Sequence, residues 1–183
     1  MKKPGLVLTL LFTGAIFALP AFAQTGAAVV VCFSPPIPGG CDPQATILRE
    51  LAGARNEILV QAYVLTARPV VDALIRAHAR GVVVRIILDR KQLRHDRNDA
   101  YAASRLVTAG IPVAVDDGVR GIAHNKVIVI DGRTVITGSY NFTWSAEHRN
   151  AENMVVINDP VVAAEYLQNW RTRESASAPL QVR

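Results

Sequence analysis

Residues 123–141 read AHNKVIVIDGRTVITGSYN and carry the clearest structural signal in the chain. Two runs rich in β-branched apolar residues, 123–130 and 134–138, are separated only by an Asp-Gly-Arg triplet. Such runs favour strands, and Asp-Gly between two of them is a strong turn signal. The stretch therefore predicts a β-hairpin.

The polar side chains of this hairpin suit chemistry on a phosphate ester. Side chains alternate along a strand with period two, so the His124 imidazole and the Lys126 ammonium emerge side by side. The returning strand brings the Ser139 hydroxyl and the Asn141 amide towards them, and a carboxylate follows at Glu152. A candidate nucleophile beside a fixed cation suits attack on an anionic phosphodiester, because positive charge must meet the charge that develops on its oxygens.

Ahead of the hairpin, strand-like apolar runs alternate with stretches of helical periodicity. The expected strands span residues 27–33, 56–65, 82–88 and 111–115, and the expected helices begin near residues 43, 66 and 98. This alternation predicts an α/β fold in which helices flank a mixed, largely parallel sheet. The 183 residues are enough for one substantial core, so we expect one domain.

Behind the hairpin, the sequence predicts one more strand and a closing helix. The strand covers residues 152–157, and Asp159-Pro160 then reads as an N-cap followed by a proline at the first helical position. We expect the folded domain to span residues 24–173 and the tail over residues 174–183 to be flexible.

The first 23 residues have the order of a secretory signal peptide. Lys2 and Lys3 precede an apolar run over residues 5–19, and small residues then occupy the A-x-A positions that end at Ala23. The alternative is an uncleaved membrane anchor, but the run is short for a span of roughly 20 residues. We therefore expect cleavage after Ala23 and a product that is periplasmic or secreted.

Two cysteines, Cys32 and Cys41, bound a segment rich in proline and glycine. An exported compartment is oxidising, and neither cysteine has His or Cys neighbours at metal-ligand spacing. The sequence favours a disulfide over two free thiols. In the chain-entropy model, closing a loop of this size contributes on the order of 3 kcal/mol to stability.

The spacing His-x-Lys-x4-Asp, followed by x6-Gly-Ser-x-Asn, resembles the phospholipase D superfamily. Within that superfamily the chain is most similar to the small bacterial endonucleases that carry the motif once. The motif fixes six residues from His124 to Asn141, and the preceding α/β order extends the likeness across nearly all of residues 24–173. The segment between the cysteines is a departure from the pattern.

The resemblance implies roles for individual residues. It implies metal-independent hydrolysis through a covalent phosphohistidine on His124, with Lys126 and Asn141 on the nonbridging oxygens. Ser139 would add a hydrogen bond at the phosphate, and Glu152 would hold the imidazole nitrogen that does not attack, the orienting role of a triad acid. Asp131, on the opposite strand parity from His124, is expected to support the hairpin.

The implied mechanism needs two histidines, but the pattern occurs once and the chain has no internal repeat. The resemblance therefore implies a symmetric homodimer, in which a two-fold axis brings one His124 from each subunit to a shared site. One histidine would then act as the nucleophile while the other acts as the general acid.

A run of cations at Arg90, Lys91, Arg94 and Arg97 separates an expected strand from the next helix. Ligand crevices of α/β folds open at such strand ends. The run is either a contact for a nucleic-acid backbone or an ordinary exposed loop. Near the motif, the sequence favours packing over base stacking for the aromatic rings of Tyr140 and Trp144.

Composition and charge narrow the possible functions. A chain with 50% hydrophobic and 19% charged residues is not a disordered one, and the net charge of +5 favours polyanionic partners. No carboxylate or histidine spacing indicates a metal or another cofactor. We expect a non-specific endonuclease that acts on DNA, with RNA as a second substrate. A phospholipid hydrolase or transferase and a non-catalytic nucleic-acid-binding protein are the alternatives.

Overall fold

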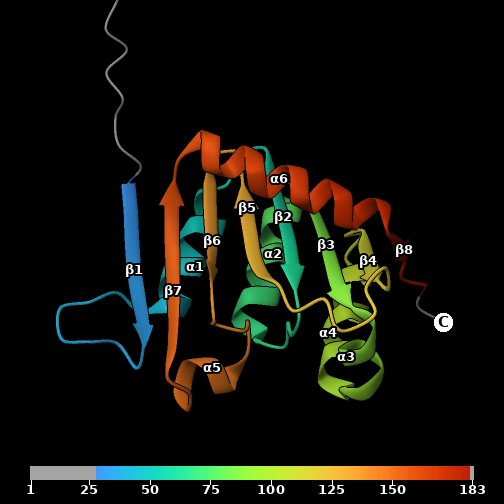
Figure 1. Ribbon diagram of the computed structural model, residues 1–183, viewed down its shortest axis with the longest axis horizontal. Coiled ribbons are helices and arrows are strands. Elements are labelled where there is room, and N and C mark those ends of the chain that lie inside the picture. The colour runs from blue at the N-terminus through green and yellow to red at the C-terminus, as the bar shows by residue number, and fades with distance from the viewer. Residues whose placement is uncertain (1–27, 182–183) are drawn as a thin grey trace, which may run out of the picture.

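The computed structural model describes residues 28–181, so the expected signal peptide lies outside the described residues. Eight strands form one sheet in the order β1-β7-β6-β5-β2-β3-β4-β8 (Figure 1). The strands are β1 (Ala28–Ser34), β2 (Glu57–Ala62), β3 (Val83–Asp89), β4 (Val113–Asp116), β5 (Lys126–Ile130), β6 (Thr134–Gly138), β7 (Glu152–Asn158) and β8 (Ser177–Pro179). The helices are α1 (Pro43–Gly53), α2 (Arg68–Ala79), α3 (Arg90–His95), α4 (Arg97–Thr108), α5 (Trp144–His148) and α6 (Pro160–Ser175).

The sheet is mixed, as expected, but the expectation that it is largely parallel is wrong. Only the β2–β3 and β3–β4 pairs run parallel, and the other neighbours run antiparallel. The parallel pairs occur where a helical crossover, α2 or α3 with α4, returns the chain to the same edge. The predicted β5–β6 hairpin is confirmed, and short connections of this kind favour antiparallel neighbours.

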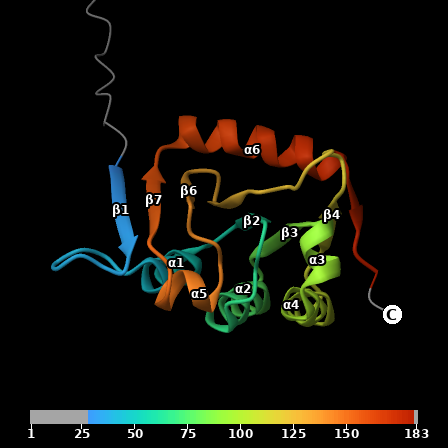
Figure 2. The same ribbon diagram turned by 60° about the horizontal axis from the view of Figure 1, so that its bottom comes forward.

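Helices cover both faces of the sheet. The helices α1 to α5 lie on one side, and α6 crosses the other side alone (Figure 2). Alternate residues of β2 serve the two layers: Val60 packs in the core under α1 and α2, whereas Leu59 packs with Trp170 of α6. The centre of the sheet is therefore buried on both faces and forms a rigid base for groups at its edges.

Two segments are more ordered than the sequence predicts. The basic run after β3 is not a loop: Asp89 caps α3, which carries its first three cations, by accepting the Gln92 amide at 2.7 Å, and Arg97 begins α4. The expected flexible tail begins with structured residues. Arg173 pairs with the buried Asp116, α6 continues beyond that pair, and β8 then pairs with β4. An ion pair to a distant strand is not visible in local sequence.

Three local predictions are confirmed. Cys32 and Cys41 form a disulfide, which ties β1 to the start of α1. The helix expected to begin near residue 43 is α1, and the Asp42 side chain caps it by accepting the Ala45 amide at 2.6 Å. The Asp159 side chain caps α6 by accepting backbone amides of its first turn.

Candidate active site

His124 lies just before β5, at the edge of the sheet where β2 ends. Both of its sequence neighbours are held in place. The buried Asp89 carboxylate accepts the Ala123 amide at 2.7 Å, and the Asn125 carbonyl accepts the Tyr63 amide at 2.7 Å. His124 itself is exposed, so a fixed backbone presents its imidazole to solvent.

The Lys126 ammonium meets His124 directly. Its Nζ lies 3.0 Å from the His124 Nε2 and 3.0 Å from the His124 carbonyl oxygen. An ammonium group can only donate, so Nε2 accepts in this contact and the imidazole proton belongs on Nδ1. That tautomer places a lone pair on Nε2, the form in which an imidazole can attack phosphorus.

Burial shapes the electrostatics of Lys126, which is 7% exposed. Burial lowers the pKa of its ammonium, and the nearby Glu152 carboxylate opposes this shift by raising it. A cation removed from bulk water interacts more strongly with a phosphate than an exposed one does. Lys126 is therefore suited to bind a nonbridging oxygen beside His124.

Tyr63 is a member of the site that the sequence did not reveal. Its ring centroid lies 4.5 Å from that of His124, and the Lys126 Nζ lies 5.1 Å from the same ring. Tyr63 follows β2, and the antiparallel register of β2 with β5 pairs Ala62 with Lys126. Knowledge of that pairing would have placed Tyr63 beside the motif.

The turn after β6 is built around Gly138. Its φ of +148° is one that residues with a side chain rarely adopt, and a Cβ there would overlap the carbonyl oxygen of Asn153 in β7. The close approach lets the Ser139 amide donate to that oxygen at 3.0 Å. The glycine of the motif thus brings the chain into position for Ser139 and Asn141.

Ser139 and Asn141 differ in how fully they are bonded. The Ser139 hydroxyl donates to Glu152 and accepts the Asn153 amide at 3.0 Å, so its only proton is already used. The Asn141 Oδ1 is buried without a hydrogen-bond partner among the described residues. An unsatisfied buried acceptor is costly unless a donor reaches it, so the Oδ1 has capacity left for a hydroxyl or water, whereas only the Asn141 Nδ2 can donate to a phosphate oxygen.

The hydrogen bonds of Glu152 do not involve His124. Its carboxylate accepts from the Ser139 hydroxyl and from the Asn150 amide, the latter at 2.9 Å. Within the part of the chain that the structure describes, no hydrogen bond joins it to His124. One subunit alone therefore does not make the orienting contact that the resemblance implies, and that role stays a prediction.

Asp131 lies at the far end of β5 and binds backbone. Its carboxylate accepts the amides of Arg55, Asn56 and Glu57 at 2.9, 2.7 and 3.0 Å. Burial raises the pKa of this carboxyl, but the three amides and the Arg55 charge outweigh burial and leave the pKa below its usual value. The geometry supports the interpretation of Asp131 as a structural residue.

The basic helix α3 lies beside the segment that leads to His124. Arg90 pairs with Asp117 at 3.4 Å, and Lys91 donates to the Arg120 carbonyl at 3.4 Å. Arg94 of α3 and Arg97, the first residue of α4, are exposed. The Asp89 carboxylate that caps α3 also accepts the Ala123 amide. The start of α3 is therefore fixed close to the segment that carries His124.

The two aromatic residues near the motif do not share one environment. Tyr140 is 2% exposed and donates from its hydroxyl to Glu147, so the prediction that it packs is confirmed. Burial and the Glu147 carboxylate raise the pKa of this hydroxyl. Trp144 is 55% exposed, so the prediction that it packs in the hairpin is wrong.

Two further observations concern ions and membranes. Among residues 28–181, no three His, Cys, Asp or Glu side chains come together as a metal-binding group. Within the same range, none of the helices has both the length and the apolar character of a membrane span.

Comparisons with known proteins agree with this geometry. The family model described as "Cardiolipin synthase, PLD-like domain" matches residues 47–173. A protein of Rickettsia prowazekii named phospholipase D is 46% identical over 149 residues, which cover 81% of this chain and 69% of that protein. A mitochondrial cardiolipin hydrolase of Chlamydomonas reinhardtii is 31% identical over 73% of this chain and 63% of that protein.

A solved structure matches as well. Nuc from Salmonella typhimurium, a phospholipase D family member, superposes with a TM-score of 0.78 at 35% identity, over 86% of this chain and 100% of that one. The motif at His124, the mixed sheet and these matches agree, and the chain belongs to the phospholipase D superfamily of phosphodiesterases.

Proposed function

We propose that the protein is an exported, homodimeric endonuclease that hydrolyses DNA, and RNA as a second substrate, without a divalent metal. The observation that carries the proposal is the contact between the His124 Nε2 and the Lys126 ammonium. A nucleophilic lone pair beside a desolvated cation is what attack on a phosphodiester needs.

In the proposed first step, the lone pair on the His124 Nε2 attacks phosphorus and an N–P bond forms. The bond from phosphorus to the leaving oxygen breaks, and the partner subunit's His124 donates a proton to that oxygen. In the second step, water attacks phosphorus and the N–P bond breaks. The partner subunit's His124 accepts the proton of the water, so both imidazoles return to their starting states.

The incomplete environment of His124 supports the homodimer. The described residues of one subunit supply a nucleophile, but no second imidazole is seen in contact with it. Glu152 is bonded to Ser139 and Asn150 rather than to His124. A two-fold axis through the exposed face of His124 would supply the missing acid. Light scattering at assay concentration should give a dimer, and a fully active monomer would contradict this.

Nucleic acid is the favoured substrate class because of the cations of α3 and of the start of α4. Lys91, Arg94 and Arg97 are exposed beside the segment that carries His124, where a polyanionic backbone could run along them. The resemblance of the motif to that of the short endonucleases agrees with this choice. The disulfide and the signal-like sequence of residues 1–23 support export.

A second candidate is hydrolysis of phospholipid. The rickettsial relatives are named phospholipase D and others are named mitochondrial cardiolipin hydrolase, and the same reactive groups serve any phosphodiester. The experiment is therefore a parallel assay in excess EDTA, with plasmid DNA in one arm and vesicles of cardiolipin and phosphatidylglycerol in the other.

The proposal expects nicking and degradation of DNA by the chain from Gln24 onward, and none by the His124→Asn variant. Vesicle turnover without DNA cleavage would replace the nuclease by a lipid hydrolase. DNA binding without turnover by wild type would leave a non-catalytic binding protein.

A further inference from the structure

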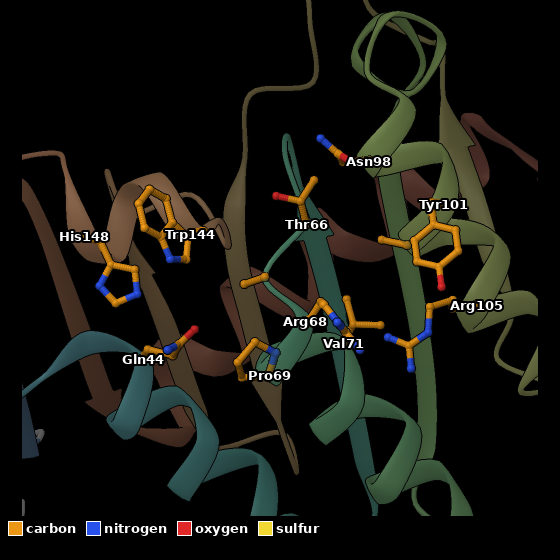
Figure 3. A pocket seen from close by; sticks show the side chains of 12 residues that line it. Gln44, Thr66, Arg68, Pro69, Val71, Asn98, Tyr101, Arg105, Trp144 and His148 are labelled. Carbon is orange, nitrogen blue, oxygen red and sulfur yellow. The ribbon is translucent and has the colours of Figure 1, made fainter.

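A second hollow of about 560 Å³ lies on the helical side of the sheet (Figure 3). It opens between the starts of α1 and α2, the exposed side of α4, and α5. His124, Lys126 and Asn141 do not line it. Its volume is in the range of pockets that hold small organic ligands. We call it the α2–α5 pocket. The hydrolytic chemistry proposed at His124 does not assign a role to this pocket.

Two aromatic side chains face the α2–α5 pocket without being packed in the core. Trp144 of α5 is 55% exposed and Tyr101 of α4 is 65% exposed, and they lie at opposite sides of the hollow (Figure 3). Exposing a tryptophan ring to water costs free energy that packing would recover. The His148 ring supports Trp144 at a centroid distance of 4.9 Å, and the Arg149 guanidinium lies 4.8 Å from its ring. These two contacts hold the ring in place, and the residue stays 55% exposed, so ring surface is left for a planar group.

The lining of the pocket is positively charged. Arg68, Arg105 and His148 contribute basic groups, and the described residues that line the pocket include no carboxylate. Asp72 pairs with Arg105 at 2.7 Å, whereas no ion pair to Arg68 is formed within the described part of the chain. An aromatic platform beside cations fits a ligand that joins a planar ring to a negative charge.

The pocket and the reactive site share two short backbone segments. Tyr63 packs on His124 and Thr66 lines the pocket, and in the same way Asn141 belongs to the site and Trp144 to the pocket. The amides of Thr66 and Ala67 donate to the Phe142 carbonyl at 2.9 and 2.8 Å, which locks the two segments together. Three residues span at most about 10 Å, so the pocket lies close to the reacting phosphate.

We propose that the α2–α5 pocket binds the nucleotide next to the scissile phosphate, with its base stacked on Trp144 and its phosphate drawn towards Arg68. This inference rests on the proposed nuclease function. Stacking is tolerant of sequence, because every base has a π face. The pocket would hold a single strand in line for His124 without selecting a base, and an apolar acyl chain would leave its basic groups unpaired.

Fluorescence provides a direct test, because Trp170 is 1% exposed and Trp144 is the exposed tryptophan of the described residues. The probe is a short thymidine oligonucleotide added to the His124→Asn chain, which cannot cut it. An abasic oligonucleotide of the same length carries the same charge and no bases. The proposal expects the thymidine oligonucleotide to quench the tryptophan fluorescence and the abasic oligonucleotide to quench it little. It also expects Trp144→Leu to abolish the quenching and to weaken binding about 5- to 150-fold.

Matched variants separate the pocket from general effects of charge or folding. Arg68→Ala is compared with Arg171→Ala, which removes an exposed arginine from α6 on the opposite face. Trp144→Leu is compared with Phe33→Leu, an exposed aromatic residue in β1. The pocket variants should weaken oligonucleotide binding and the controls should not. Turnover of methyl p-nitrophenyl phosphate, which has no flanking nucleotide, should be nearly unchanged in all four.

The outcomes separate failure of the pocket from failure of the nuclease. Equal binding by pocket and control variants, in a chain that cuts DNA, would overturn the pocket and leave the nuclease intact. Equal quenching by the abasic strand would exclude base stacking. If wild type neither binds nor cuts DNA, the nuclease function fails first. Loss of vesicle turnover in Trp144→Leu with DNA binding unchanged would instead assign the pocket to a lipid.

Discussion

One sequence motif spans both ends of β5, but its residues have different roles at the two ends. At its start, His124 is exposed and Lys126 meets it from a desolvated position. At its far end, the Asp131 carboxylate accepts three backbone amides from residues 55–57, where β2 begins. One end keeps its polar groups available for a ligand, and the other uses them to hold the fold.

The difference teaches that membership of a motif does not imply contact with substrate. Four strand residues separate Lys126 from Asp131, so the two residues lie at opposite ends of the strand. Asp131 adopts a φ of +52° to make its bonds, and it thereby fixes the hairpin that presents His124. Activity should therefore depend on the first end through chemistry and on the second through folding.

The largest effect is expected for His124→Asn. The variant loses the nucleophile, so turnover of DNA in EDTA should fall by at least about 10³-fold. Because His124 is exposed, the thermal midpoint should match that of wild type. Cleavage assays measure the turnover and calorimetry measures the thermal midpoint. Residual turnover within tenfold of wild type would show that His124 is not the nucleophile.

Lys126→Met should come next. Loss of one preorganised cation at the developing charge costs about 10²- to 10³-fold in kcat. The free energy of unfolding should hold or rise, since burial lowers the pKa of the lysine and its charged form is the disfavoured one in the fold. Urea titration measures this free energy of unfolding. A large loss of stability with unchanged kcat would reverse the roles assigned to the two ends.

Asp131→Ala should have the contrary pattern. Three backbone amides lose their acceptor at about 1 kcal/mol each, so stability should fall by about 3 kcal/mol. At a temperature where the variant is folded, kcat should stay within a few-fold of wild type. Asp131→Asn is the milder control, because asparagine tolerates a positive φ and keeps one acceptor oxygen. A 10³-fold loss of kcat in a folded Asp131→Asn protein would contradict a purely structural role.

The smallest effect is a pH dependence of stability. The folded pKa of Asp131 lies below its ordinary value of 3.8, so its contribution is complete above pH 3.8 and is lost as the pH falls below it. The gap in thermal midpoint between wild type and Asp131→Asn should be constant near neutrality and should narrow in acid. A gap that widens on acidification would show that the carboxylate does not stabilise the fold.

The parts of the fold that could be predicted from sequence are the locally encoded ones. The Asp-Gly turn between two apolar runs, the Asp159-Pro160 helix start and the Cys32–Cys41 disulfide depend on residues close in the chain. For the same reason, the motif spacing was enough to bring His124 and Lys126 together.

The parts that escaped prediction depend on pairing between distant segments. The antiparallel register of β2 with β5 places Tyr63 on His124, and nothing near residue 63 encodes it. The ordered start of the tail depends on the Arg173–Asp116 pair, and the exposure of Trp144 depends on where α5 docks. Local propensity cannot report such contacts, because tertiary packing creates them.

Trapping of the covalent intermediate is the most direct test of the different roles of His124 and Asp131. DNA with radiolabelled phosphates is mixed with the chain in EDTA and quenched in alkali, where a phosphohistidine survives, and the label on protein is measured. Wild type and Asp131→Asn should carry acid-labile label, and His124→Asn should carry none. DNA cleavage without label on wild type, or label that persists in His124→Asn, would contradict the assignment of His124 as the nucleophile.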